Sequence, residues 1–386
     1  MVVREMVNIV PILFYFLFTS TILSPLYSNT AIWLFVFIPL FDLNFIRSLR
    51  YINKKTFQVL CVFFLLFIMS FDYLLLLKLI CIVIVVSYLI YTYENKQFYL
   101  YFFVSTNIVI GLIQYLLFTF FDIKFLDPAV IGEFLYGDFA MTTGNTFAPG
   151  FLLDLRISGL NREPGFFSSL IISALVIIFF DNIDRGKKIL YYLLFFLGLI
   201  ITFSKVTLVF LIVLPIIYIS RRILDAFGTV FIGLISVFVI SLIVNYFYYK
   251  TNIQLHPTLV YEGGSIYHRT IGYYVISDLS LDDLLFGVAR DIESLANKLP
   301  YIKNSEWWGY DRLLFDNSGL SFIIINFGLL SFILMLFLLK RLNVKGSMLF
   351  IFIILTISVN PLTTTSFVML SYFILFYGRD LNEKCS

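Results

Sequence analysis

Apolar runs of about 15 to 24 residues recur from one end of the chain to the other, and such a run is long enough to cross the ~30 Å hydrocarbon core of a bilayer. The composition agrees, because 60% of the 386 residues are hydrophobic and only 13% are charged. Within lipid each backbone polar group must be paired inside its own segment, and runs such as 74–77 lack the alternation of a membrane strand. The pattern therefore predicts an all-α polytopic integral membrane protein.

About twelve transmembrane helices are expected. The chain shows no tandem repeat and no low-complexity linker, so we treat residues 1–386 as a single membrane domain. Two apolar stretches, 189–220 and 347–378, can each be interpreted as one long helix or as two shorter ones. The expected spans lie near 7–23, 31–46, 57–71, 73–93, 98–121, 164–180, 189–204, 206–220, 227–249, 319–339, 347–359 and 363–378.

Basic residues in short loops mark the cytoplasmic side of a membrane. Both ambiguous stretches have basic residues at each end, so each must enter and leave on one side and form a hairpin. This arrangement places both termini in the cytoplasm, together with more than half of the 27 Lys and Arg residues. The strongest basic stretches are Arg47–Lys55, Arg185–Lys188, Arg221–Arg222 and Lys340–Lys345.

Two outer loops, 122–163 and 250–318, are far longer than the other connections. Loops of more than about 15 residues are uncommon unless they fold or function. A transporter has little need of such loops, because its substrate site lies near the bilayer midplane on discontinuous helices. Long loops on one face therefore favour an enzyme that works on the outer surface of the membrane.

The first outer loop ends in two arginines and a glutamate directly before an apolar helix. Pro164 suits the first turn of that helix, because its missing N–H is not needed there. The free N–H groups of a helix start bind anions, so Arg156 and Arg162 beside it predict a site for a lipid-linked phosphate. In the alternative interpretation, the arginines contact lipid headgroups or pair with Asp154 and Glu163.

The second outer loop holds another candidate phosphate ligand, Arg269, next to His268. Asp316 and Asn317 stand where this loop re-enters the membrane, which is an unfavourable place for a carboxylate without a function. The alternatives are a surface role for Arg269 and an N-cap role for Asp316 or Asn317, since both residue types are favoured at that position.

Other candidate substrate-binding residues lie in both halves of the chain. Trp307 and Trp308 suit stacking on sugar rings or, alternatively, an interfacial aromatic belt. Lys205, at the tip of a predicted hairpin, either snorkels outward or joins the anion site. Arg290 and Arg312 are further cations of the second outer loop.

Several classes of chemistry lack support in the sequence. The two histidines have no cysteine or paired acid at ligand spacing, so we expect neither a metal site nor a cofactor. The phosphate-loop and nucleophile-elbow motifs are missing, which argues against ATP chemistry and serine hydrolysis. The net charge of +3 follows from the inner loops and does not imply a nucleic-acid partner.

The chain resembles the O-antigen and capsular polysaccharide polymerases of bacterial envelopes, a superfamily shared with the O-antigen ligases. Four segments within about residues 150–340 carry the resemblance in the family's order. The stretch from Arg156 to Pro164 is similar to the family's arginine–glycine–(glutamate)–proline motif ahead of a membrane helix. Thr202–Lys205 is similar to its serine–basic pair in the next hairpin.

The other two segments belong to the large outer loop and the helix after it. Arg269 followed by Leu284–Gly287 resembles the family's arginine and downstream leucine–phenylalanine–glycine. Asp316–Ser318 with Phe327–Leu330 resembles its closing aspartate/histidine–asparagine pair and glycine-bearing helix. Asp316 stands where the ligase branch usually has histidine, which favours a polymerase. The pair of Arg-x10-Gly motifs that some polymerases show is absent, so those roles are not carried over.

The resemblance implies a metal-independent glycosyltransferase in the bacterial cytoplasmic membrane. It would join undecaprenyl-diphosphate-linked oligosaccharide repeat units into O-antigen or capsular polysaccharide on the outer face. Arg156, Arg162 and Arg269 would stabilise the departing diphosphate, because prepositioned donors aimed at developing charge are typically the largest catalytic factor.

A carboxylate would remove the acceptor proton, with Glu163 or Asp316 as candidates and His268 as the third. The implied partners are the lipid-linked oligosaccharide, membrane lipids, a chain-length regulator and a flippase. Two alternatives stay open, namely a ligase-type transferase with the same donor and a flippase for the lipid-linked oligosaccharide.

Overall fold

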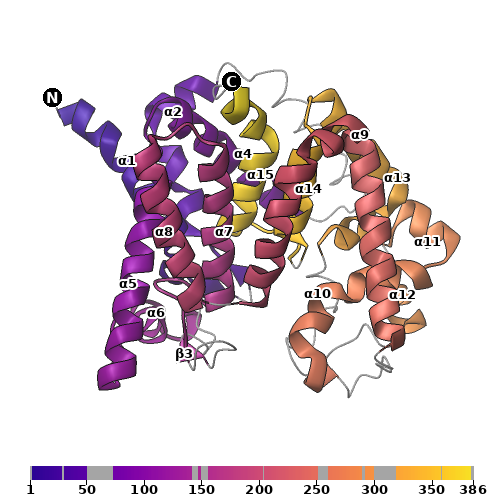
Figure 1. The fold of residues 1–386 in the computed structure, drawn as a ribbon, viewed down its shortest axis with the longest axis horizontal. Coiled ribbons are helices and arrows are strands. Elements are labelled where there is room, and N and C mark those ends of the chain that lie inside the picture. Colours follow the sequence, from indigo (N-terminus) through magenta and orange to yellow (C-terminus); the bar gives the residue numbers. More distant parts are fainter. Residues whose placement is uncertain are drawn as a thin grey trace. The chain divides into compact units, whose positions relative to one another are not determined.

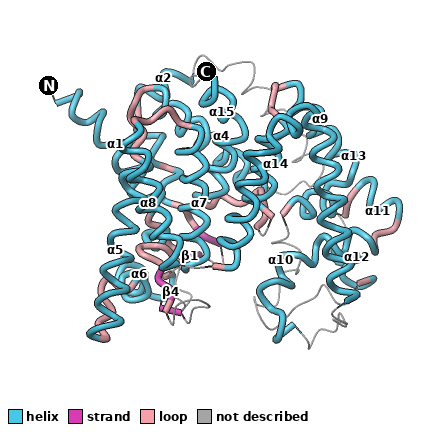
Figure 2. Tube along the Cα trace, in the orientation of Figure 1, coloured by secondary structure: helices cyan, strands magenta, loops and turns pink. Residues whose placement is uncertain are grey.

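The computed structural model describes residues 2–27, 30–49, 73–140, 147–148, 155–202, 204–250, 260–288, 292–299, 319–357 and 359–383. The chain divides into two compact units. Unit 1 comprises Met1–Ile52, Cys81–Tyr218 and Thr364–Ser386, and unit 2 comprises Asn53–Ile80 and Ile219–Thr363. Almost all of the described chain is helical, as the tube in Figure 2 shows. The expected span 57–71 lies outside the described residues.

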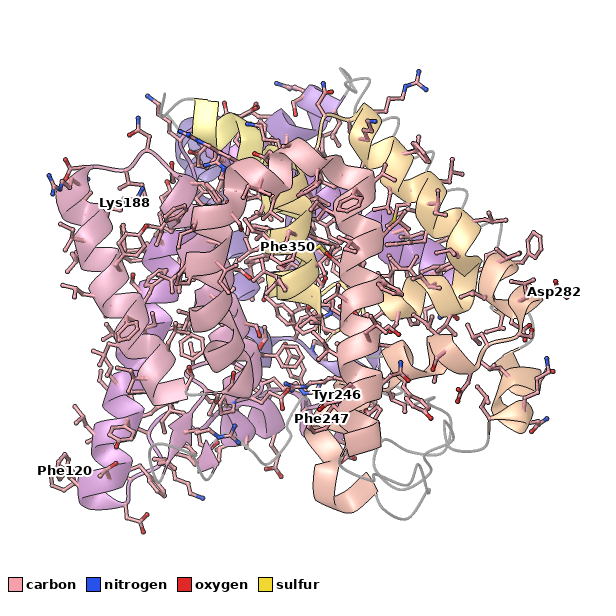
Figure 3. All side chains as sticks on the ribbon, turned by 45° about the vertical axis from the view of Figure 1, so that its right-hand side comes forward. Phe120, Lys188, Tyr246, Phe247, Asp282 and Phe350 are labelled. Carbon is pink, nitrogen blue, oxygen red and sulfur yellow. The ribbon has the colours of Figure 1, made fainter. Side chains whose placement is uncertain are left out.

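Four helices in the described part of the chain are long and apolar enough to cross a membrane. Many of their large apolar side chains point outward, such as Phe120, which is 70% exposed at the end of α5 (Figure 3). An outward apolar surface fits contact with lipid, so the fold is that expected of an all-helical membrane protein. The four are α4 (Tyr73–Glu94), α5 (Leu100–Phe121), the segment Ile219–Tyr248 of α9 (Lys205–Lys250) and α13 (Leu320–Arg341).

The centre of unit 1 is α7 (Pro164–Phe180), which packs against α5, α8 (Arg185–Thr202) and α15 (Ser366–Glu383) (Figure 1). This helix is apolar on all sides, and a helix of that composition is stable only when it is surrounded. Phe167, for example, is fully buried. At the end of α7, the Lys188 amine donates to the carbonyls of Phe179 and Asp181 at 3.1 and 3.0 Å.

The N-terminal part of unit 1 differs from the prediction in one place. After α1 (Val2–Thr19), residues 31–46 form short pieces in place of the expected membrane helix. Asp42 caps the last of these pieces, because its carboxylate accepts from the N–H groups of Asn44 and Phe45 at the start of α2. The short pieces are η1 (Thr21–Leu23), the antiparallel pair β1 (Leu26–Tyr27) and β2 (Thr30–Ala31), η2 (Leu34–Val36), η3 (Ile38–Phe41) and α2 (Leu43–Ser48).

The first predicted outer loop contains regular structure. It holds α6 (Pro128–Tyr136), η5 (Gly137–Phe139) and the antiparallel pair β3 (Phe147–Ala148) and β4 (Arg156–Ile157). Both stretches interpreted as hairpins do consist of two separate helices. They are α8 followed by α9, and α14 (Gly346–Thr356) followed by α15.

Unit 2 contains most of α9 together with α13 and α14. The predicted outer loop 250–318 contributes three further helices, α10 (Val260–Asp278), α11 (Leu281–Phe286) and α12 (Ile292–Lys298). Side chains of α10 form a core with α9, α12 and α13, in which Ile271, Tyr273 and Ile325 are fully buried. This loop is therefore a folded part of the unit.

A close approach of two glycines joins α11 to α13. Both Gly287 and Gly328 have positive φ, of 79° and 81°, and Gly328 interrupts the helical geometry of α13. A Cβ added to Gly328 would lie 2.3 Å from the carbonyl oxygen of Leu285, so the two backbones touch. The Val288 N–H donates to the Ile325 carbonyl at 2.8 Å, which gives a partner to a carbonyl group beside the break.

Candidate functional site

The candidate site is built around residues 156–163, which we call the arginine segment. It begins at Arg156 on β4, passes through a turn closed by a hydrogen bond from Asn161 N–H to the Ser158 carbonyl at 3.0 Å, and ends at Glu163. Gly159 in this turn has a φ of +58°, and a Cβ there would lie 3.0 Å from the Asn107 carbonyl oxygen. The segment thus runs close to the backbone of α5.

Thr21 ties the end of the arginine segment to the chain that follows α1. Its hydroxyl donates to the Asn161 carboxamide oxygen at 3.2 Å and accepts from the Arg162 N–H at 3.0 Å. Thr21 and Asn161 are both fully buried or nearly so. The direction of the chain at Arg162 is therefore set by side chains remote in sequence.

The apolar helix begins at Pro164, as the sequence predicts. Glu163 takes the N-cap position with extended backbone, and its side chain makes no capping hydrogen bond to the helix. The Arg162 guanidinium lies over the Phe166 ring, 5.8 Å from its centroid, which is within the range of a cation–π interaction. Phe166 in turn meets Phe367 of α15 edge to face, with 5.6 Å between ring centroids.

Two contacts bring the starts of other helices to the start of α7. The Phe166–Phe367 contact joins it to the first turn of α15, which begins at Ser366. The hydroxyls of Ser168 and Ser204 are 2.7 Å apart, and Ser204 directly precedes α9 at Lys205. All three helix starts belong to unit 1.

The arrangement concentrates positive potential. The N-terminus of a helix carries a partial positive charge and free N–H groups, and anions bind there. Here the starts of α7, α9 and α15 come together beside the half-buried Arg162, and half-buried Arg156 begins the same segment on β4. In Figure 1, β3, which pairs with β4, and the end of α15 lie at opposite ends of unit 1. This end of unit 1 is therefore suited to a multiply charged anion.

The structure accounts for only some of the predicted site residues. It places Arg156 on β4 and Arg162 and Glu163 directly before α7, all within the arginine segment, with Lys205 as the first residue of the neighbouring α9. The side chain of Lys205 is outside the described part. The remaining predicted residues Arg290, Trp307, Trp308, Arg312, Asp316 and Asn317 also lie outside the described residues.

Arg269 and His268 belong to unit 2, on α10, and the His268 side chain is not among those described. Next to Arg269, the hydroxyls of Thr270 and Tyr248 are 2.7 Å apart. The Leu320 N–H donates to the Tyr273 hydroxyl at 3.3 Å, which joins α10 to the start of α13. Half-buried Arg269 therefore lies on a helix that is hydrogen-bonded both to α9 and to the start of α13.

The acidic pair Asp282–Asp283 begins α11. Ser280 caps this helix, because its hydroxyl accepts from the Asp283 N–H at 3.2 Å and donates to the Asp283 carboxylate at 2.7 Å. The bond from Ser280, followed by that from Lys298, lowers the pKa of Asp283. Within the described ranges no group of three or more His, Cys, Asp and Glu side chains could hold a metal ion.

Several residues of the site were not singled out from the sequence. Asn107 and Gln114 are isolated amides in an apolar run, and polar residues inside a membrane helix usually have a function. The sequence therefore contained a pattern that indicated these two residues. The Ser168–Ser204 contact and the position of α15 depend on packing between helices far apart in the sequence. No pattern within either segment indicates those contacts.

No family model, no curated protein and no solved structure matches the chain. The helices themselves indicate an all-helical membrane protein, and the geometry of the candidate site favours the binding of an anion at one end of unit 1.

Proposed function

We propose that this protein polymerises undecaprenyl-diphosphate-linked oligosaccharide repeat units into O-antigen or capsular polysaccharide at the outer face of the bacterial cytoplasmic membrane. The observation that carries the proposal is the meeting of three helix starts beside Arg162, in the segment that begins at Arg156. A diphosphate is a multiply charged anion, and this is the place in unit 1 best suited to one. The order of the four motif segments supports the same family.

The proposal includes about twelve spans, cytoplasmic termini and two outer loops. The meeting of α7, α9 and α15 supports this topology. In it, the predicted spans 164–180, 206–220 and 363–378 all run from the outer face inward, so their starts belong on one side. Lys188 and Phe120 lie at opposite ends of unit 1 in Figure 3, as expected for an inner and an outer position.

In the proposed reaction, a hydroxyl at the non-reducing end of one repeat unit attacks the anomeric carbon of the donor chain. The bond from that carbon to the diphosphate oxygen breaks, and negative charge develops on the diphosphate. Arg156, Arg162 and the helix N–H groups stabilise that charge. Glu163 accepts the acceptor proton, and its carboxylate is not engaged in capping α7.

Arginine substitutions in the purified full-length protein test the assignment. With a lipid-linked repeat unit as the only substrate, the unmodified protein should produce a ladder of glycan chains. Arg156→Ala and Arg162→Ala should each lower the rate at least about 100-fold, because a charge-stabilising donor is lost. Arg185→Ala is the matched control, since Arg185 is exposed and also begins a helix, α8. Ladders of normal length and rate in both site variants would remove the diphosphate assignment.

One observation favours a second candidate, a flippase. The break in α13 at Gly328 is of the kind found in transporters, whose sites lie at discontinuous helices. Here, however, the backbone of α11 fills the break, with Val288 bonded to Ile325. Movement of the lipid-linked unit across liposomes without any new glycosidic bond would establish the flippase, and transfer to a lipid acceptor other than a repeat unit would establish a ligase.

A further inference from the structure

Two amide side chains are buried in α5, a helix that is otherwise almost entirely apolar. Asn107 is 2% exposed and Gln114 is 1% exposed. They lie seven residues apart, which places them on one face of the helix two turns from each other. Burying an amide without hydrogen bonds is costly, so the partners of these two side chains identify what that face of α5 holds.

Asn107 joins the arginine segment to the end of α1. Its carboxamide oxygen accepts from the Leu160 N–H at 3.2 Å. Its nitrogen donates to the carbonyl and the hydroxyl of Thr19 at 3.3 and 3.2 Å. Both ends of the amide are therefore used, and the side chain fixes residue 160 against α1.

Gln114 joins the arginine segment to the chain before α6. Its nitrogen donates to the Gly159 carbonyl at 3.2 Å and to the Leu126 carbonyl at 3.0 Å. A primary amide has two N–H groups, so both are satisfied by backbone carbonyls. Consecutive residues 159 and 160 are thus each held by a different amide of α5.

The amides of α5 supply two hydrogen bonds to the turn, and the chain after α1 supplies others through Thr21 and through the Ile22 N–H, which donates to the Leu160 carbonyl at 3.2 Å. Among the described residues, the Ser158 hydroxyl, the Asn161 nitrogen and the Gln114 oxygen are buried without a hydrogen-bond partner. Ser158 and Asn161 are both fully buried. Removing either amide would take a hydrogen-bond partner from the Leu160 N–H or the Gly159 carbonyl, and a buried backbone group without a partner is costly.

We propose that Asn107 and Gln114 are positioning residues for the arginine segment. Together with Thr21 they hold the turn 158–161, which leads into Arg162 and the start of α7. Neither side chain need touch the substrate. An effect of these two residues on catalysis rests on the proposed function, whereas their role in holding the arginine segment does not.

A distance measurement tests the positioning without any substrate. The full-length protein, with Cys61, Cys81 and Cys385 changed to serine, carries one spin label at Leu160→Cys and another at Leu193→Cys, an exposed position on α8. Asn107→Leu and Gln114→Met keep the size of the side chains and remove their hydrogen bonds. Each should broaden or shift the distance distribution between the labels.

Thr106→Val is the matched control, because the Thr106 hydroxyl is exposed and bonds only to Phe102 of its own helix at 3.0 Å. It should leave the distribution unchanged. Asn107→Asp is the conservative variant, because it keeps the acceptor for the Leu160 N–H, and its distribution should lie closer to the unmodified one than that of Asn107→Leu. An unchanged distribution in both Asn107→Leu and Gln114→Met would overturn the positioning role.

Kinetics then separate the two proposals. Misplaced arginines should lower kcat about 10- to 100-fold with a smaller change in KM, because charge on the diphosphate develops mainly in the transition state. Asn107→Asp should recover part of that loss. A shifted distance distribution with unchanged polymerisation would uphold the positioning role and overturn the assignment of the arginine segment to the reaction.

Discussion

At the scale of single residues, Arg162 connects the sequence motif to the fold. Its backbone is held by Thr21, and its guanidinium lies on the Phe166 ring, which itself contacts α15. A planar cation between an aromatic face and a helix start is oriented as well as charged. The identity of this residue as arginine is therefore expected to matter beyond its charge.

Arg162→Lys tests that expectation. Lysine keeps the positive charge but loses the planar, forked geometry that suits a phosphate oxygen pair, so the polymerisation rate should fall about tenfold. That loss should be smaller than for Arg162→Ala. Phe166→Leu should give a partial loss through the same orientation effect. Initial rates of ladder formation by the purified variants provide the measurement, and a rate equal to the unmodified protein for Arg162→Lys would contradict the oriented role.

The residues of the site were predictable in part, for a physical reason. Arg156, Arg162 and Glu163 stand directly before a proline and an apolar helix, so their place at a helix start follows from local sequence. The proximity of Lys205 to that place depends on the packing of α7 with the start of α9, which no local pattern encodes. The role proposed for Arg269 stays a prediction, because α10 belongs to unit 2.

At the scale of elements, glycines decide where helices break. Gly228 in α9 and Gly328 in α13 have nearly the same backbone geometry, with φ of 75° and 81°. They differ in surroundings, since none of the described atoms lies within 4 Å of a Cβ at Gly228, whereas a Cβ at Gly328 would meet α11. Comparing substitutions at these two glycines therefore distinguishes the energetic cost of a strained backbone from the cost of a steric contact with α11.

Alanine at these two positions should have unequal effects. Gly228→Ala should cost about 1 kcal/mol, the strain of positive φ alone, and Gly328→Ala about 3 kcal/mol or more, because the backbones of α11 and α13 must also separate. Thermal unfolding of both variants in the same detergent and at the same scan rate gives the comparison. Equal midpoints would mean that the close approach of α11 and α13 contributes little.

Most helices followed from the length of the apolar runs, because lipid requires each span to satisfy its own backbone. The run 31–46 is an exception, because it forms short pieces, the last of which is a separate helix capped by Asp42. The helices α10, α11 and α12 were missed as packed elements, because their sequence is more polar and their burial comes from α9 and α13. In the described residues, apolar length thus indicated where helices form but did not indicate the packed helices of the second outer loop.

At the scale of the whole molecule, the proposed topology places the arginine segment outside and the basic stretches inside. Exposed positions on described helices allow a direct check. In a cysteine-free background, Glu133→Cys on α6 should react with a membrane-impermeant maleimide in intact spheroplasts. Lys187→Cys on α8 should react only after permeabilisation. The reverse pattern would place the arginine segment away from its proposed substrate.

The contact between α11 and α13 also bears on how the protein is assembled. Because α11 lies earlier in the chain than α13, it has left the ribosome before the broken helix is inserted. The Val288 N–H just after α11 is then available to bond to the Ile325 carbonyl when the interrupted span is inserted, so that this carbonyl need not face lipid unpaired. The segment that pairs with the break in α13 is therefore synthesised before α13 itself.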